Sequence, residues 1–544
     1  MKKITIIASA LLLALGFSSC SKQLENPRKG ANDFNTFYAN ATAADAEKLI
    51  AEVYKVYFSG PEEVQIQNFF EIISDDSDCG GGTYADNANR YRNADELTCQ
   101  PSDWLFHGPR RGYSLYQALY VCIYHCNLIL DKIPETNDAD INRVKAEARF
   151  LRAVCLFEAM RVWHNPPFAD HIYSSDDMYA PNGDPAEMID WILSNLEEAA
   201  KNLPAKAGKG QQALLGGRAT AGAAQAFYGK AATWYAAKYN QPEYAKKAIE
   251  PLKALIEGNK YGLIDNPADL FRVKSDFCDE YIFERNCAET SSDKALQNDN
   301  RQTWRSLRND NIYIPSEIFA YGWGFCLPTQ AYVDFMKSHD GENTPRFKAK
   351  LASYEDLLAM DYDSENKGIL PGRAYPNVIG YFNATCLMWK ADVYTETGGN
   401  IYSRANNPII RYAEVLLMYA EAQVVANNDA DGSGLRALNE VRSRAKLEPL
   451  NSINLQAVID ERRAELYCEG ERWFDIDRFK LGADVLKDAG KKRYAFRGYK
   501  PGTTEYDIEV TDGEGHGWDD KYYDLPFGDN EIQANENLVQ HKGW

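Results

Sequence analysis

The chain has 544 residues and a formal net charge of -19, and 12% of its residues are aromatic. A surface this negative disfavours binding to nucleic acid or to anionic lipid, because both are negatively charged themselves. Neutral ligands are affected least. The 34 tyrosines and 10 tryptophans provide many flat rings on which sugars can stack, although most aromatic side chains in proteins serve packing.

The first twenty residues have the parts of a secretory signal in order: basic MKK, the apolar run 4–17, then SSC. The run is shorter than the roughly 20 apolar residues that span a bilayer. The segment resembles the lipobox of bacterial lipoproteins, in which the cysteine is acylated; the alternative is a simple secretory signal with a chance cysteine. We predict a signal peptide over 1–19, then lipidated Cys20 and a tether over 20–40, with lipid as the only anchor.

Apolar residues at helical spacing predict a series of helices in the N-terminal half. The predicted ranges are 42–59, 115–133, 144–163, 185–203, 221–239 and 243–257. Between 74 and 112 the pattern fails and Gly, Asn and Asp dominate, so we predict a long irregular loop there. Ala-rich helices in consecutive antiparallel pairs favour tetratricopeptide-like packing, with degenerate repeats because no clean 34-residue period is visible.

The middle of the chain has a different character, because Gly, Pro, Asn and aromatic residues interrupt short apolar runs from 260 to 405. Few amphipathic helices are predicted there beyond 330–338 and 354–360. Helices resume at 408–425, 435–445 and 455–470, and the tail from Trp473 is predicted to be irregular. The fold is therefore predicted to be mostly α-helical.

We predict one domain over 41–544 after the signal and tether. Its helical-repeat scaffold comprises mainly 42–257 and 408–470. The region 260–405 and the loop 74–112 lie outside this scaffold.

The C-terminal half contains the runs RYAEVLLMYAEA, ALNEVRSRA and IDERRAELYCEGERWFDIDRF. Earlier segments and the chain end add YQALYVCIYHCN, AEARFLRAVCLFEAMRVWHNPPF, AAQAFYGKAATWYAA and LPFGDNEIQANENLVQHKGW. In this order they resemble the SusD/RagB family of Bacteroidetes outer-membrane lipoproteins. The resemblance spans nearly the whole chain, and the ERRAEL–EGERW block is its most specific part.

We interpret that block as scaffold rather than as a catalytic site. Arg462 with Glu465, and Arg463 with Glu469, lie within reach of each other along or near one helix, so we predict local charge pairs. Gly470 suits a helix stop.

No catalytic motif points to an enzyme. The sequence has no H-E-x-x-H, no G-x-S-x-G and no phosphate-binding loop, and its seven histidines are far apart. A glycosidase carboxylate pair stays an open alternative, since nothing singles one out. We predict no catalytic residue, no cofactor and no metal.

One segment matches a calcium loop, with Asp429, Asp431, Ser433 and Glu440 in the pattern D-x-D-x-S-G-x5-E. The alternative, which we favour, is a turn between two helices, because residues 435–445 already have a helical pattern.

The cysteines form no C-x-x-C pair. Cys122, Cys126 and Cys155 lie in predicted helices and are interpreted as small buried apolar residues. Cys79 and Cys99 lie in the predicted loop and are candidates for a disulfide, although sequence alone does not determine pairing.

The resemblance implies a variable ligand-binding region, here 260–405 together with the loop 74–112, in which the ligand binds to the loops 74–112 and 298–330. An oligosaccharide requires stacking on aromatic rings plus hydrogen bonds from amides and guanidinium groups, since each sugar has an apolar face ringed by hydroxyls. In YGWGF, glycines flank Trp323 and favour its exposure; for any single aromatic the alternative is core packing. The candidate ligand-binding residues are Tyr84, Tyr91, Trp104, Trp304, Arg308, Tyr313, Tyr321 and Trp323.

The resemblance implies a lipid-anchored protein at the cell surface of the outer membrane. It would capture a glycan oligosaccharide and pass it to a SusC-like TonB-dependent transporter. A peptide-binding RagB-like protein is the alternative within the family, and a lipid-anchored glycosidase is a third possibility of another class.

Overall fold

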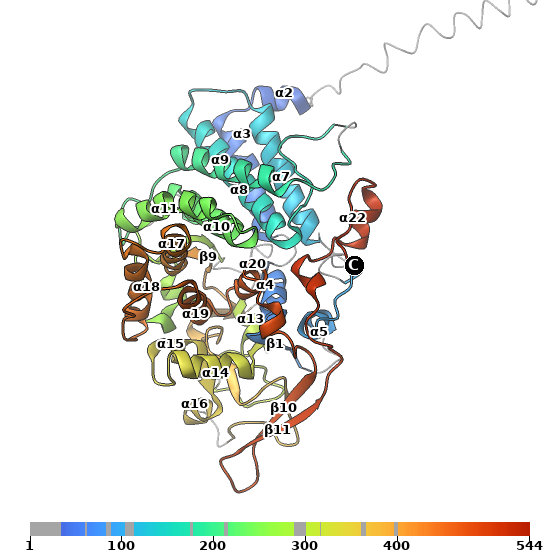
Figure 1. Cartoon of the computed structure of the whole chain (residues 1–544), viewed down its shortest axis with the longest axis vertical. Helices are drawn as coiled ribbons and strands as arrows, with labels where there is room; N and C mark the ends of the chain where they lie inside the picture. Colours follow the sequence, from blue (N-terminus) through green and yellow to red (C-terminus); the bar gives the residue numbers. More distant parts are fainter. Residues whose placement is uncertain are drawn as a thin grey trace, which may run out of the picture.

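The computed structural model describes residues 34–59, 63–82, 89–103, 114–174, 178–211, 216–287, 301–315, 317–360, 366–395 and 401–544. The predicted signal peptide, Cys20 and most of the predicted tether lie outside these ranges. Helices dominate the described chain, and its strands form small antiparallel sheets, so the mostly α-helical prediction is confirmed (Figure 1). Within the described ranges, no helix combines the length and the hydropathy needed to cross a membrane.

The N-terminal helices form where the apolar pattern predicted them. After the short helix α2 (Phe34–Ala39) come α3 (Ala43–Ser59), α7 (Leu115–Lys132), α8 (Ala139–Trp163), α9 (Pro185–Asn202), α10 (Ala221–Lys238) and α11 (Pro242–Glu257). Polar side chains begin several of them: Ser114 accepts the Gln117 N–H at 3.1 Å, and Asp184 accepts the Ala186 N–H at 2.7 Å. The bounds differ from the predicted ones by a few residues at most, apart from the earlier start of α8.

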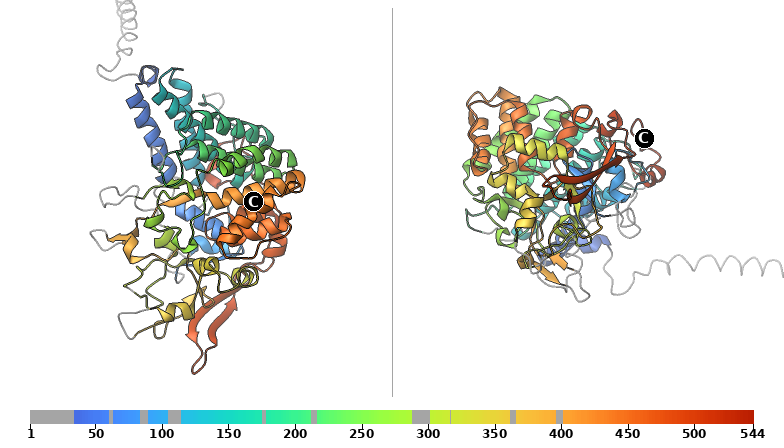
Figure 2. Two further views of the ribbon diagram at one scale, coloured as in Figure 1. Left: turned by 90° about the vertical axis from the view of Figure 1, so that its left-hand side faces the viewer. Right: turned by 90° about the horizontal axis from the view of Figure 1, so that it is seen from below.

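These helices pack in chain order, with α7 against α8, α8 against α9, α9 against α10 and α10 against α11 (Figure 2). Small residues allow close approach: a Cβ atom on Gly229 of α10 would lie 2.3 Å from Leu252 Cδ2 of α11. Helix α11 then packs against α17 (Tyr412–Asn427), which in turn contacts α18 (Ser433–Arg444) and α19 (Leu455–Glu465). The two predicted parts of the scaffold therefore form one continuous helical array.

The chain between α11 and α17 consists of short elements. They are η1 (Pro267–Asp269), η2 (Val273–Ser275), β2 (Tyr281–Arg285), α13 (Arg301–Arg305), β3 (Phe325–Pro328), α14 (Gln330–His339), α15 (Pro345–Lys350), β4 (Leu351–Ser353), α16 (Tyr354–Ala359), β5 (Tyr375–Pro376), β6 (Tyr381–Asn383), η3 (Lys390–Asp392), β7 (Val393–Thr395), β8 (Ile401–Ser403) and β9 (Asn407–Arg411). Strands pair antiparallel as β2 with β9, β4 with β6 and β7 with β8. The two helices predicted in this region, α14 and α16, are confirmed.

The segment predicted as an irregular loop over 74–112 is partly regular. Strand β1 (Ser77–Gly80) pairs antiparallel with β3, and helix α5 (Asn89–Asp95) follows, while α4 (Glu63–Ile72) precedes it. The prediction was wrong here because β1 is short and its partner strand is distant in sequence, so no local alternation signals it. All ten cysteines in the described chain are free, which excludes a Cys79–Cys99 disulfide in this structure.

The tail beyond α19 is also more regular than predicted. It contains α20 (Arg472–Arg478), α21 (Gly482–Val485), β10 (Lys492–Tyr499), β11 (Tyr506–Asp512), η4 (Asp520–Tyr523) and α22 (Asp529–Ala534). Strands β10 and β11 form a ribbon at the opposite end of the molecule from α2 (Figure 1), and β10 also pairs with β5.

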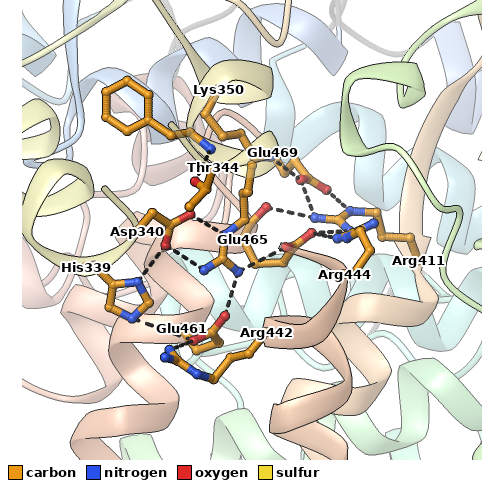
Figure 3. Close-up of polar contacts among 12 residues, drawn as sticks. His339, Asp340, Thr344, Lys350, Arg411, Arg442, Arg444, Glu461, Glu465 and Glu469 are labelled. Atoms are coloured by element: carbon orange, nitrogen blue, oxygen red, sulfur yellow. Dashed lines mark hydrogen bonds and ion pairs between the residues drawn. The ribbon is translucent and has the colours of Figure 1, made fainter. Parts of the chain in front are cut away.

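The charges of the ERRAEL block pair with distant segments instead of with each other. Glu465 is buried among three arginines: Arg411 Nη1 lies 2.8 Å from its Oε1, Arg346 Nη1 lies 3.3 Å from its Oε2, and Arg444 also contacts it (Figure 3). Burial raises the pKa of Glu465, but the guanidinium groups outweigh burial and hold this pKa well below its usual range. The predicted Arg462–Glu465 pair is therefore wrong.

The other predicted pair is replaced in the same way. Arg462 Nε donates to Asp475 Oδ2 at 2.9 Å, Arg463 Nε donates to Asp76 Oδ1 at 2.7 Å, and Glu469 pairs with Arg411 at 2.7 Å. Helix α19 ends at Glu465, before the predicted stop. The block is scaffold as predicted, but its charges connect separate elements.

The calcium-like segment forms the turn between α17 and α18. Asp429 accepts the Gly434 N–H at 2.7 Å and the Leu435 N–H at 2.9 Å, while Asp431 accepts the Ser433 N–H at 2.9 Å. These carboxylates therefore complete the first turn of α18, which supports the turn interpretation.

Candidate ligand-binding surface

The loop Tyr321–Gly324 is fixed to the segment that contains α13 by three backbone hydrogen bonds. Gly322 N donates to Leu307 O at 2.6 Å, Trp323 N to Thr303 O at 2.7 Å and Gly324 N to Ser306 O at 2.9 Å. A Cβ atom on Gly322 would lie 2.6 Å from Thr303 O, so only glycine allows this approach. The loop turns the side chains of Tyr321 and Trp323 outward, and they are 40% and 44% exposed.

Trp323 rests on a cluster of other aromatic rings. Its ring centroid lies 4.5 Å from that of Trp304, and Trp304 lies 5.1 Å from Phe325. Tyr91 packs beneath them, 5.3 Å from Phe325 and 6.2 Å from Trp304. The tilted and edge-to-face geometry is the favoured one for aromatic pairs. An exposed indole on a packed base is held in a defined orientation and offers a face for a ligand to stack on.

The two predicted loop regions meet at this cluster. Gly81 N donates to Gly324 O at 2.8 Å, and Arg308 Nη1 donates to Gly81 O at 3.1 Å. A Cβ atom on Gly81 would lie 2.1 Å from Phe325 Cε1, so the glycine admits the aromatic ring. The pairing of β1 with β3 therefore brings the region 74–112 beside the region 298–330.

Arg308 supplies a cationic group where the two loop regions meet. Its Nη2 lies 2.7 Å from Asp310 Oδ2, and its backbone N–H donates to the Tyr375 hydroxyl at 3.0 Å. Burial raises the pKa of Tyr375, so this hydroxyl stays neutral at physiological pH. The ion pair with Asp310 balances the charge of Arg308, and the surface as a whole suits a neutral polar ligand.

Two acidic groups lie behind the cluster. Burial raises the pKa of Asp95 to about 6, and burial together with Asp95 raises that of Asp78 well above its usual range. Asp95 Oδ2 also accepts the Cys79 N–H at 3.2 Å.

The predicted site residues have different environments. Trp323 and Tyr321 are exposed, and Trp304 and Arg308 are half-buried. Tyr313 is also half-buried, but its N–H donates at 2.8 Å to Gly368 O, in a segment outside the Trp323 cluster. Tyr91 is fully buried, so the prediction that it offers a face to a ligand does not hold in this structure. Tyr84 and Trp104 lie outside the described residues.

Sequence reasoning missed two supports of this surface, Phe325 and Gly81. Phe325 looked like an ordinary apolar residue, and Gly81 belongs to a run of three glycines. Only the glycine run gave a signal, since such a run permits close approach of another segment.

A tetratricopeptide-like helical array is the fold of SusD-like proteins. A model described as "SusD family" matches residues 279–544, and a model described as "Starch-binding associating with outer membrane" matches 34–231. The chain belongs to the SusD/RagB family.

Individual relatives agree with this assignment. The chain is 25% identical over 422 residues to the starch-binding protein SusD of Bacteroides thetaiotaomicron, covering 70% of each chain. It is 22% identical over 450 residues to SusD-like protein P25 of Formosa agariphila, covering 78% of this chain and 77% of that one.

Solved structures show the same fold. A laminarin-binding SusD-like protein superposes with a TM-score of 0.71 at 25% identity, covering 92% of this chain and 99% of that chain. Surface glycan-binding protein A of Bacteroides thetaiotaomicron, solved in complex with laminarihexaose, gives a TM-score of 0.69 at 19% identity, covering 92% of this chain and 99% of that chain.

Proposed function

We propose that this protein binds a glycan oligosaccharide at the surface formed by Tyr321, Trp323 and Arg308. The observation that carries the proposal is the exposed indole of Trp323, which is fixed on Trp304 with one part open to solvent. A sugar ring can stack on that face while its hydroxyls reach polar groups at the edge. The names of relatives that bind laminarin, laminarihexaose and starch support a glycan as the class of ligand.

The protein would act at the outer membrane, anchored through an acylated Cys20, and would deliver its ligand uncleaved to a SusC-like TonB-dependent transporter. The order of basic, apolar and small residues before Cys20 supports a lipid anchor at that cysteine. The description of the family model that matches the N-terminal half supports a location at the outer membrane. Mass spectrometry of the N-terminal peptide tests the anchor, since a Cys20→Ser variant must lose any acyl chains. Copurification of a β-barrel transporter from outer membranes tests the partner.

The binding proposal is tested by titrating residues 21–544 with host and plant oligosaccharides and with mixed peptides. Tryptophan fluorescence reports binding, and chromatography afterwards shows whether the sugar is intact. We expect saturable quenching by one glycan class and recovery of the intact sugar. Binding of peptides alone would favour the RagB-like alternative, and cleaved sugar would overturn the non-enzyme proposal.

A further inference from the structure

A cavity of about 240 Å³ lies apart from the Trp323 surface, between η1, α15, β4, α16 and the segment that follows β6. Twelve of its seventeen lining residues are apolar. Leu270, Phe271, Phe319 and Leu351 among them are buried side chains. The exposed residues Ala268 and Lys348 lie at its rim. We propose that this cavity binds a small aryl carboxylate.

The apolar lining determines the body of the ligand. A sugar placed here would lose the hydration of its hydroxyls against walls that offer few partners, which is unfavourable. An apolar cavity of roughly 150 Å³ is sufficient for one benzene ring. A cavity of about 240 Å³ therefore has room for an aromatic ring with a short side chain.

Arg272 supplies hydrogen-bond donors for the ligand. Its guanidinium carbon lies 4.1 Å from the centroid of the Trp389 ring, and its Nε donates to Asp392. Within the described part of the chain, Nη1 and Nη2 have no hydrogen-bond partner, and neither has Lys348 Nζ. The Trp389 face and Asp392 hold the guanidinium plane, so its two Nη groups are arranged to bind a carboxylate side by side.

The other charged residues of the lining are already engaged. Lys350 Nζ lies 3.6 Å from Glu469 Oε1 in the buried network of Figure 3, so this residue contributes its aliphatic stem. Asp356 Oδ2 accepts the Ser353 N–H and the Ser353 hydroxyl, both at 2.8 Å, at the start of α16. Asp392 balances the charge of Arg272, so Lys348 at the rim supplies the positive charge that is not paired within the described residues, and the Nη groups of Arg272 add hydrogen bonds to a carboxylate.

The test uses 3-phenylpropionate as the probe and 3-phenylpropanol as its neutral control, titrated calorimetrically into the full chain in a non-ionic detergent. We expect one molecule of the acid to bind per chain. The alcohol should bind at least about tenfold more weakly, because it cannot form the charged hydrogen bonds. No saturable heat with the acid, or equal affinity for both compounds, would overturn the proposal.

Three variants locate the binding. Arg272→Gln should abolish the difference between acid and alcohol, and Lys348→Gln, at an exposed position, should reduce it by a few-fold while the fold is preserved. Ala268→Trp should block both compounds by filling the rim. Lys246→Gln, an exposed lysine of α11, is the matched control and should change nothing. Undiminished acid binding in Ala268→Trp would overturn the location. The proposal does not rest on glycan binding at Trp323.

Discussion

The helical scaffold and the ligand-binding surface are held together by different interactions. The scaffold combines fully buried helix faces with buried ion pairs, such as the three arginines around Glu465. The Trp323 surface is held by backbone hydrogen bonds and aromatic contacts, and its outermost rings are exposed. Exposed rings contribute less to the free energy of folding than buried ones do. They can therefore be substituted to suit another ligand while the scaffold keeps its fold. Stability and binding should therefore respond to different substitutions.

The largest effect on stability is expected at Glu465. Glu465→Gln keeps the shape but leaves three buried arginines with too little negative charge, so the free energy of unfolding should fall by about 3–5 kcal/mol. Urea denaturation followed by circular dichroism measures this. Glu198→Gln, which breaks an exposed 3.1 Å pair with Lys201, is the control and should cost less than about 1 kcal/mol. Equal effects of the two substitutions would contradict the difference between buried and surface charge.

The second effect is on the pH dependence of the free energy of unfolding, and it is expected at Glu284 of β2. Burial raises the pKa of this carboxyl to about 7, so the folded state retains a proton that the unfolded state has already released. Its stabilising contribution is complete below about pH 4.5 and is lost as the pH rises through 7. Glu284→Gln should therefore flatten the decline in stability between pH 5 and 8 by up to about 3 kcal/mol.

Unfolding midpoints at several pH values, with the exposed Glu250→Gln as control, provide the measurement. The amide oxygen introduced by Glu284→Gln would still accept from Asn406 Nδ2, which donates to Glu284 at 2.9 Å. An unchanged slope in Glu284→Gln would show that neighbouring groups, such as Asp276 with its pKa of about 7, carry the pH dependence instead.

The sequence predicted the scaffold better than the surface for a physical reason. Helices such as α9 and α11 depend on local spacing of apolar residues and on caps within a few residues, so their bounds were nearly correct. The partners of Glu465 come from three other segments, and nothing local indicates them. Strand β1 likewise needs β3, which is far away in sequence.

Within the site, the glycines around Trp323 were a usable signal because they permit a turn with the ring outward. Tyr91 carried no comparable signal. It lies in α5, where a turn of helix places it beneath Phe325. Exposure of a single aromatic depends on tertiary packing, and composition gives no measure of it.

The effect specific to Trp323 is expected on binding. Trp323→Ala should weaken glycan binding ten- to hundredfold, corresponding to about 1.4–2.7 kcal/mol, because the stacking face is removed. The free energy of unfolding should fall about as much as in Tyr124→Ala, because the two side chains are 44% and 46% exposed. Tyr124→Ala, at an exposed aromatic of α7, is the control for both measurements. Unchanged affinity in Trp323→Ala would place the glycan elsewhere.

The smallest effect is expected where the two regions meet, at Trp304. Trp304→Phe keeps an aromatic ring under Trp323 but removes part of its 4.5 Å contact, so glycan affinity should fall only a few-fold. Stability should fall by about 1 kcal/mol, as for a modest change in packed volume. Trp389→Phe is matched to it, because Trp389 is also half-buried and lies 4.8 Å from Phe319 in an edge-to-face pair. If both variants lose stability but only Trp304→Phe loses affinity, the supporting ring acts by orienting Trp323. If Trp304→Phe lowers stability alone, Trp323 keeps its orientation through the backbone hydrogen bonds of its own loop.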